Sequence, residues 1–288
     1  MISTSFDYES PTTLEEAVRL LARTRDARVL AGGHSLLPLM KLGLAQPRAL
    51  VDLGRIKALR EIRASGDTIT IGALATHQSI ADHATIRERL TALAEAAAWV
   101  GDLQVRGRGT IGGSLAHADQ AADEPAPTLA FDATVRAIGP KGERLIPARD
   151  FFKSTFETAL GPGEILAEVR FPAPPARTGS AYAKFPHPAS RFAIVGIAAV
   201  VTLGKDGKIE RAAIGVTGAS ATPFRATGAE KALAGTRGEP KDLDAAAPNA
   251  AQGVTTLADL VASSEYRSHL ITVYARRALE RALERARA

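Results

Sequence analysis

The chain has 288 residues, of which 45% are hydrophobic and 23% charged, so it is long enough for two or three small domains with apolar cores. It contains no cysteine, which excludes disulfide bonds, thiolate-bound zinc and iron–sulfur clusters bound by its own residues. Its six histidines show no paired ligand spacing, which argues against a metal site. The net charge of +5 comes from dispersed basic residues, which argues against nucleic-acid binding.

The composition also bears on the compartment and the core. No apolar run reaches the ~20 residues of a membrane-spanning helix, and the first residues lack the basic and apolar regions of a secretory signal. We therefore expect a cytoplasmic protein with no integral membrane segment. Aromatic residues make up only 5% of the chain, so the core is expected to be aliphatic.

The N-terminal part of the chain is typical of a β-α-β unit. Apolar residues recur at helical spacing from Leu14. Capping candidates precede Leu14, and acids lie in the first turn of the expected helix. A strand is expected at 29–31, a short helix at 36–42 and a second strand at 49–53. The turn that follows a strand in such a unit is a common place for a phosphate group.

Two glycine-rich turns are the most informative features. The first is Gly32-Gly33-His34-Ser35, after the predicted strand, and the second is Thr110-Ile111-Gly112-Gly113-Ser114. Glycine lets a ligand approach the main chain, and free N–H groups and hydroxyls bind anions. A single such turn is more often a tight connection without a ligand. The pair predicts two cradles around one extended diphosphate, and a Gly-x-Gly-x-x-Gly pattern for nicotinamide is absent after the strand.

Hairpins and helices alternate through the middle of the chain. We expect hairpins at 59–71 and 133–146, helices at 76–82, 86–100 and 125–131, and a strand at 164–171. The stretch 101–113 is rich in glycine and is predicted to be irregular.

A proline-rich linker at 172–179 separates the last part of the chain. Strands are expected at 181–185, 192–203 and 209–217, in an antiparallel sheet, and the chain ends in an amphipathic helix with an arginine-rich face. The segment 242–252 is rich in Ala and Asp and is predicted to be an exposed loop.

An acidic cluster, Asp119, Asp123 and Glu124, follows the second turn. A carboxylate here could accept hydrogen bonds from ribose or ribityl hydroxyls. The alternative is a capping cluster for the helix expected at 125–131, and both interpretations can hold together.

Single polar residues give weaker signals. His34 and His117 lie in or beside the turns, and a backbone or surface role is favoured over a flavin-linking or catalytic one. Lys184, followed by Arg191, could offset negative charge on a reduced cofactor or could be a solvated strand end.

In this order, these segments resemble the FAD-binding medium subunit of the molybdenum hydroxylases, the carbon monoxide dehydrogenase and xanthine dehydrogenase family. The resemblance covers nearly the whole chain and is carried by segments 31–38, 50–53, 110–119, 122–123, 163–166, 184–193 and 265–270. It implies an α+β fold with a two-lobed FAD-binding domain of the vanillyl-alcohol-oxidase (PCMH) type. The lobes would be residues 1–57, a βαβ unit, and 58–176, followed by a small α+β domain at 177–288 with an antiparallel sheet and helices.

The resemblance also implies which residues bind the cofactor, a non-covalent FAD. From the first turn these are Leu30, Ala31, Gly32, Gly33, His34, Ser35 and Leu36. From the second turn and its surroundings they are Val105, Gly109, Thr110, Gly112, Gly113, Ser114, Ala116 and His117. Further along the chain they are Ala122, Asp123, Leu166 and Lys184. No catalytic residue and no metal ligand is expected in this chain.

By the same resemblance, the chain is an electron-transfer subunit of an oxidoreductase. A large partner subunit would carry molybdopterin, and a small partner would carry [2Fe–2S] clusters that pass electrons to FAD in this chain and on to an external acceptor. The assembly is expected to be a dimer of heterotrimers. The lack of cysteine agrees with clusters held elsewhere.

Two alternatives remain. A stand-alone FAD-dependent reductase or oxidase on the same fold would need its own acid or base, for which His117 and Tyr182 are faint candidates. A scaffold that has lost its cofactor is the other, and the intact glycines at both turns argue against it.

Overall fold

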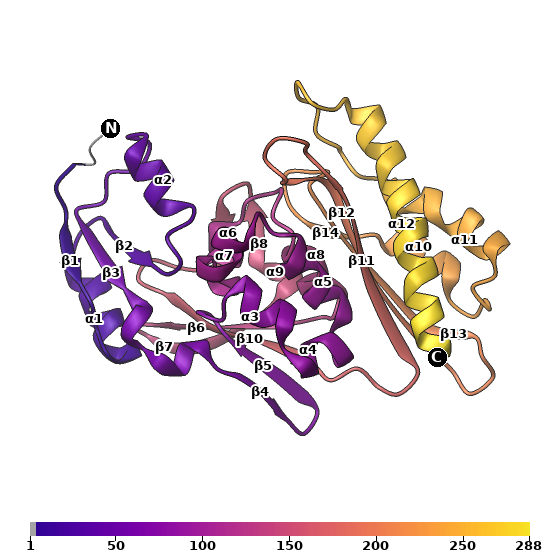
Figure 1. The fold of residues 1–288 in the computed structure, drawn as a ribbon, viewed down its shortest axis with the longest axis horizontal. Coiled ribbons are helices and arrows are strands. Elements are labelled where there is room, and N and C mark those ends of the chain that lie inside the picture. Colours follow the sequence, from indigo (N-terminus) through magenta and orange to yellow (C-terminus); the bar gives the residue numbers. More distant parts are fainter. Residues whose placement is uncertain (1–3) are drawn as a thin grey trace.

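The computed structural model describes residues 4–288, which form three larger sheets with helices packed around them (Figure 1). The N-terminal sheet has the order β1-β3-β2 and is parallel. Its strands are β1 (Asp7–Glu9), β2 (Ala27–Leu30) and β3 (Ala49–Asp52), with helices α1 (Leu14–Arg23) and α2 (Leu36–Lys41) between them. The predicted β-α-β unit is thus confirmed, and the first glycine turn joins β2 to α2.

A second, five-stranded antiparallel sheet follows, in the order β4-β5-β10-β6-β7. Its strands are β4 (Ile62–Ser65), β5 (Thr68–Gly72), β6 (Thr134–Gly139), β7 (Gly142–Pro147) and β10 (Ile165–Pro172). Short 3-10 turns at Leu53–Arg55 and Lys57–Arg60 precede it, so the first hairpin strand begins later than its predicted start. The same part of the chain contains α3 (His77–Asp82), α8 (Pro125–Ala130), α9 (Ala148–Phe151) and a small hairpin of β8 (Phe152–Ser154) and β9 (Glu157–Thr158).

The prediction of an irregular stretch at 101–113 is wrong, because it contains α6 (Leu103–Arg108) and the start of α7 (Ile111–His117). Each helix begins at a side-chain cap: Asp102 accepts a hydrogen bond from the Val105 N–H, and Thr110 accepts one from the Gly113 N–H. These caps satisfy N–H groups of the first turn, which have no acceptor within the helix.

The alanine-rich helix expected at 86–100 is two helices, α4 (Ala84–Arg89) and α5 (Thr91–Trp99), which are divided at Leu90. Leu90 is fully buried and has a non-helical backbone conformation. Tertiary packing of this leucine therefore overrides the local helix propensity of the alanines.

The C-terminal part has a four-stranded antiparallel sheet, β11-β12-β13-β14, covered by the long helix α12. Its elements are β11 (Thr178–Pro186), β12 (Ala193–Leu203), β13 (Ile209–Thr217), β14 (Phe224–Arg225), α10 (Thr227–Leu233), α11 (Pro240–Ala246) and α12 (Ser264–Arg287). Figure 1 shows β11 lying between α5 of the middle part and α12.

The prediction of an exposed loop at 242–252 is also wrong. This stretch forms most of α11 and a 3-10 turn at Ala247–Ala251, and Leu243, Ala246 and Ala250 are buried in the core under α12. A reciprocal capping box between Glu239 and Asp242 starts α11. The apolar positions at helical spacing were hidden by the low-complexity composition.

One core joins the middle and C-terminal parts. Tyr182, Ala198 and Val200 of the C-terminal sheet belong to the same buried cluster as Ala92 and Leu93 of α5. Within residues 4–288, no helix is both long and apolar enough to cross a membrane.

Candidate functional site

The first glycine turn presents unsatisfied backbone donors. Among residues 4–288, no acceptor is found for the N–H groups of Gly32, Gly33, His34 and Ser35. Gly33 has a φ of +77°, a conformation that side-chain-bearing residues rarely adopt. His34 is exposed, and its Nδ1 lies 3.1 Å from the Gly32 carbonyl oxygen. Successive free N–H groups at a turn form a concave site for an anion.

The second turn differs from the first in where its N–H groups go. The Ile111 and Gly112 N–H groups donate to backbone carbonyls of residues 75 and 73, at 3.1 and 2.9 Å. The Gly113 N–H donates to Thr110 Oγ1 at 3.1 Å. This turn therefore provides a fixed surface and the Thr110 and Ser114 hydroxyls, whereas the free amides expected at both turns are found at the first.

The glycines bring the two turns into contact. A Cβ on Gly32 would overlap the Arg108 carbonyl oxygen and lie 2.9 Å from the Cα of Gly109. A Cβ on Gly113 would lie 3.7 Å from the Cβ of Ala31. Only a residue without a side chain permits the approach at Gly32, so the two segments, far apart in the sequence, form one backbone-lined cradle.

Asp123, which follows the second glycine turn in the sequence, is buried and is held by the C-terminal sheet. Its Oδ1 accepts a hydrogen bond from the Tyr182 hydroxyl at 2.6 Å, and its Oδ2 accepts one from Lys184 Nζ at 2.8 Å. Burial raises the pKa of Asp123, although the Lys184 ammonium opposes this, and burial lowers the pKa of Lys184. The Lys184 side chain is fully buried, so its interpretation as a solvated strand end is wrong.

Glu124 forms a second buried pair next to the first. Its Oε1 lies 2.8 Å from Nδ1 of His77, a residue that sequence reasoning did not single out. Glu124 stands at the N-cap position of α8, but its side chain does not cap the helix, so that alternative fails for this carboxylate. Burial lowers the pKa of His77, but the Glu124 carboxylate raises it, and the pKa ends above its ordinary 6.5.

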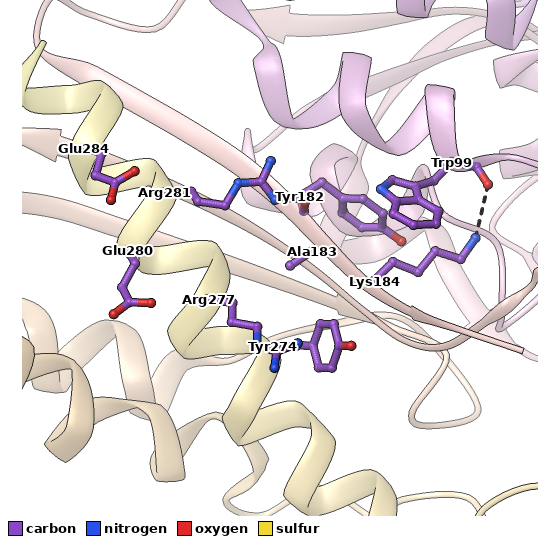
Figure 2. Close-up of a pocket in the computed structure, with 9 residues that line it drawn as sticks. All are labelled: Trp99, Tyr182, Ala183, Lys184, Tyr274, Arg277, Glu280, Arg281 and Glu284. Atoms are coloured by element: carbon purple, nitrogen blue, oxygen red, sulfur yellow. Dashed lines mark hydrogen bonds between the residues drawn. The ribbon is translucent and has the colours of Figure 1, made fainter.

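Lys184 also lines a cavity of about 350 Å³ (Figure 2). Its walls come from the end of α5, from β11 and from α12, and include Trp99, Tyr274 and Arg277. Lys184 Nζ lies 3.4 Å from the Trp99 carbonyl oxygen, as Figure 2 shows. No residue of either glycine turn lines this cavity.

The remaining predicted site residues are either partly or fully exposed near the cradle or buried within the protein. Near the cradle, Leu30 ends β2, Leu36 begins α2, Val105 lies on α6 and Ala116 is exposed on α7. His117 is half-buried, with its ring 4.9 Å from that of Phe156, and burial lowers its pKa. Ala122 and Leu166 are buried, Leu166 within the core on β10. No group of three or more potential metal-ligating side chains occurs in the part of the chain that the structure describes.

Two family models match the chain. The FAD binding domain in molybdopterin dehydrogenase matches residues 4–174, and the CO dehydrogenase flavoprotein C-terminal domain matches residues 180–282. The chain therefore belongs to the FAD-binding medium subunits of the CO dehydrogenase and molybdenum hydroxylase family. It is an oxidoreductase subunit, and FAD is the cofactor of its binding domain. The resemblance, the fold class and the cofactor expected from the sequence are confirmed.

The curated relatives extend over the whole chain. It is 43% identical over 284 residues to the 6-hydroxypseudooxynicotine dehydrogenase complex subunit alpha of Paenarthrobacter nicotinovorans, covering 98% of this chain and 96% of that protein. It is 39% identical over 288 residues to the carbon monoxide dehydrogenase medium chain of Afipia carboxidovorans, covering 100% of both.

Solved structures agree with this assignment. Carbon monoxide dehydrogenase from Hydrogenophaga pseudoflava matches with a TM-score of 0.94 and 40% identity, covering 99% of each chain. Quinoline 2-oxidoreductase from Pseudomonas putida 86 matches with a TM-score of 0.94 and 31% identity, covering 100% of each chain.

Proposed function

We propose that this chain takes electrons from [2Fe–2S] clusters of a small partner subunit and passes them, by way of a non-covalently bound FAD, to an external acceptor. A large partner subunit carries molybdopterin and the substrate, and the complex is a dimer of heterotrimers in the cytoplasm. We also propose the division into lobes 1–57 and 58–176 and a C-terminal domain at 177–288. The absence of cysteine from this chain supports clusters on another subunit.

The cradle is the observation that carries the proposal. The free N–H groups of Gly32 to Ser35 fit the non-bridging oxygens of a diphosphate. Because Gly32 has no side chain, the first turn lies directly against the backbone at Gly109, where the second turn begins. The hydroxyls of Thr110 and Ser114 are further donors on that facing turn. The residues present therefore fit the diphosphate of FAD.

FAD, when bound, exchanges electrons both singly and in pairs, which suits a relay between one-electron clusters and a two-electron acceptor. The chain itself binds and orients the cofactor. Asp123 and Lys184 form a buried ion pair in which each charge is compensated by the other. We accordingly assign no general acid or base to this chain.

A stand-alone reductase or oxidase is the alternative, and the structure weakens its acid–base candidates. Tyr182 is fully buried, its hydroxyl donates to Asp123, and burial together with that carboxylate raises its pKa well above 10.0. His117 packs against Phe156 and is half-buried. Tyr182 is therefore not free to exchange a proton with a substrate, which leaves only the partly exposed His117 as a candidate for the alternative.

Visible absorption spectra test the proposal. We expect the purified chain to show a flavin spectrum that is released as free FAD on denaturation, and the chain co-expressed with its neighbouring genes to bring iron–sulfur absorbance with it. A colourless chain in both preparations would contradict FAD binding. A flavin spectrum without any co-purifying subunit, together with reductase activity, would favour the stand-alone alternative.

A matched pair of glycine variants tests the cradle itself. Gly32→Ala places a Cβ against the backbone at Arg108, whereas Gly107→Ala adds one in open space on the neighbouring helix. We expect Gly32→Ala to weaken FAD binding by at least about tenfold, because the added Cβ would overlap the Arg108 carbonyl oxygen and force the two turns apart. Gly107→Ala should bind as the wild type does, as measured by quenching of flavin fluorescence. Equal affinity of both variants would contradict the role of the contact.

A further inference from the structure

The second glycine turn is built on the segment that leads into α3. The backbone N–H of His77 donates to the Gly109 carbonyl at 3.0 Å, and the Ile111 N–H donates to the Ala75 carbonyl at 3.1 Å. These bonds lie on either side of Thr110, which caps α7. The position of this turn relative to the first therefore depends on where the start of α3 is held.

The His77 ring lies between the turn and Glu124. On one side, a Cβ placed on Gly109 would be only 2.7 Å from His77 Nε2, so the ring fills the space that a side chain at residue 109 needs. On the other side, Nδ1 is 2.8 Å from Glu124 Oε1. The imidazole is 6% exposed and the carboxylate 0%, so both groups depend on each other rather than on water.

The charges around His77 favour its protonated form. Burial lowers the pKa of His77. Glu124 and Asp123, which precede α8, raise this pKa, Arg106 on α6 lowers it, and the net direction is upward. The second oxygen of Glu124, Oε2, is buried and has no hydrogen-bond partner in the described chain. Among the described side chains, the Glu124 carboxylate is bonded only to His77 and loses that partner if the imidazole is removed.

We propose that His77 is a positioning residue for the flavin: its imidazolium, anchored by Glu124, holds Gly109 and the second glycine turn in the arrangement that binds FAD. The inference rests on the proposed function, because it assigns His77 a role in a cradle for FAD. It adds a residue that has no place in either glycine motif. It also predicts that flavin affinity falls as pH rises, because the ion pair is lost when the imidazolium loses its proton.

The test uses the full-length chain freed of flavin. The dissociation constant for FAD is measured by fluorescence quenching at about pH 6 and about pH 8.5, on either side of the ordinary histidine pKa, together with the melting temperature of the flavin-free protein. His77→Asn keeps a donor near the Nδ1 position but removes the charge. His83→Asn is the matched control, because His83 lies at the end of the same helix and its Nδ1 has no hydrogen-bond partner among the described residues.

We expect wild type and His83→Asn to bind FAD more weakly at the higher pH than at the lower. At the lower pH, His77→Asn should bind FAD about tenfold more weakly than wild type does, and its affinity should not fall further at the higher pH. Glu124→Gln, which neutralises the other end of the pair, should also remove the pH dependence and serves if His77→Asn fails to fold.

Three results would overturn the inference. His77→Asn and Glu124→Gln could keep the wild-type affinity and pH profile. Alternatively, His77→Asn could lower the melting temperature while FAD affinity stays unchanged, which would show a merely structural role. Failure of the wild-type chain to bind FAD at either pH would instead sink the proposed function, and this inference with it.

Discussion

Glu95 and Arg281 are 186 positions apart in the sequence, yet the Arg281 guanidinium donates a hydrogen bond to Glu95 Oε1 at 2.5 Å. Arg285 donates to the same oxygen at 2.6 Å, and the other oxygen accepts the backbone N–H of Tyr182 at 2.7 Å. A single carboxylate on α5 thus joins the flavin-binding domain to the edge strand β11 and to the C-terminal helix. The arginine-rich face of that helix is partly an internal interface rather than a solvated surface.

Removing this carboxylate should loosen the junction. We expect Glu95→Ala to lower the free energy of unfolding by about 1–3 kcal/mol, because one backbone N–H and two guanidinium groups lose their acceptor. Urea denaturation measures the change, and Glu88→Ala, at an exposed position on α4, is the control. Equal stability of the two variants would show that the junction depends on apolar packing alone.

Substituting Lys184 alone should destabilise the fold more than substituting Lys184 and Asp123 together. Lys184→Met leaves a buried carboxylate uncompensated, and we expect it to reduce stability by about 3–5 kcal/mol. Adding Asp123→Asn removes that charge and should restore a large part of the loss. A double-mutant cycle from denaturation curves gives the coupling free energy, and additive effects of the two changes would contradict a direct interaction.

The Glu164–Arg144 pair gives a pH dependence of stability with a defined sign. Hydrogen bonds from Arg144 and the Gly161 N–H lower the pKa of Glu164 below its ordinary 4.5, although burial opposes them. A carboxyl group with a lowered pKa stabilises the fold above its ordinary pKa and loses that contribution as pH falls through the folded-state value. We expect Glu164→Gln to be less stable than wild type by about 1 kcal/mol at neutral pH.

The difference between Glu164→Gln and wild type should shrink as pH falls below 4.5, where the wild-type carboxylate itself becomes protonated. Thermal unfolding at a series of pH values follows this change. Glu143→Gln, on the neighbouring hairpin and largely exposed, is the comparison variant. A constant difference across the pH range would show that the effect of residue 164 is steric rather than electrostatic.

Local signals in the sequence determined much of the fold. The apolar spacing from Leu14, the turn glycines and the proline-rich linker each act through backbone preferences of neighbouring residues, and such preferences can be recognised along the chain. The same holds for the two glycine turns, whose role is set by the absence of side chains at Gly32 and Gly112. The family resemblance is carried by these segments.

Only the tertiary structure decided where the buried charges go. Asp123 pairs with Lys184 of β11, and Glu124 pairs with His77 of α3, from the segment that precedes α8. Nothing in the spacing of these residues along the chain distinguishes them from surface residues. The helix divided at Leu90 and the buried α11 were likewise decided by packing. A buried charge requires a partner because water is excluded, and the partner is whichever side chain the fold brings near. The sequence therefore determined the turns, and the three-dimensional structure determined which side chains hold them in place.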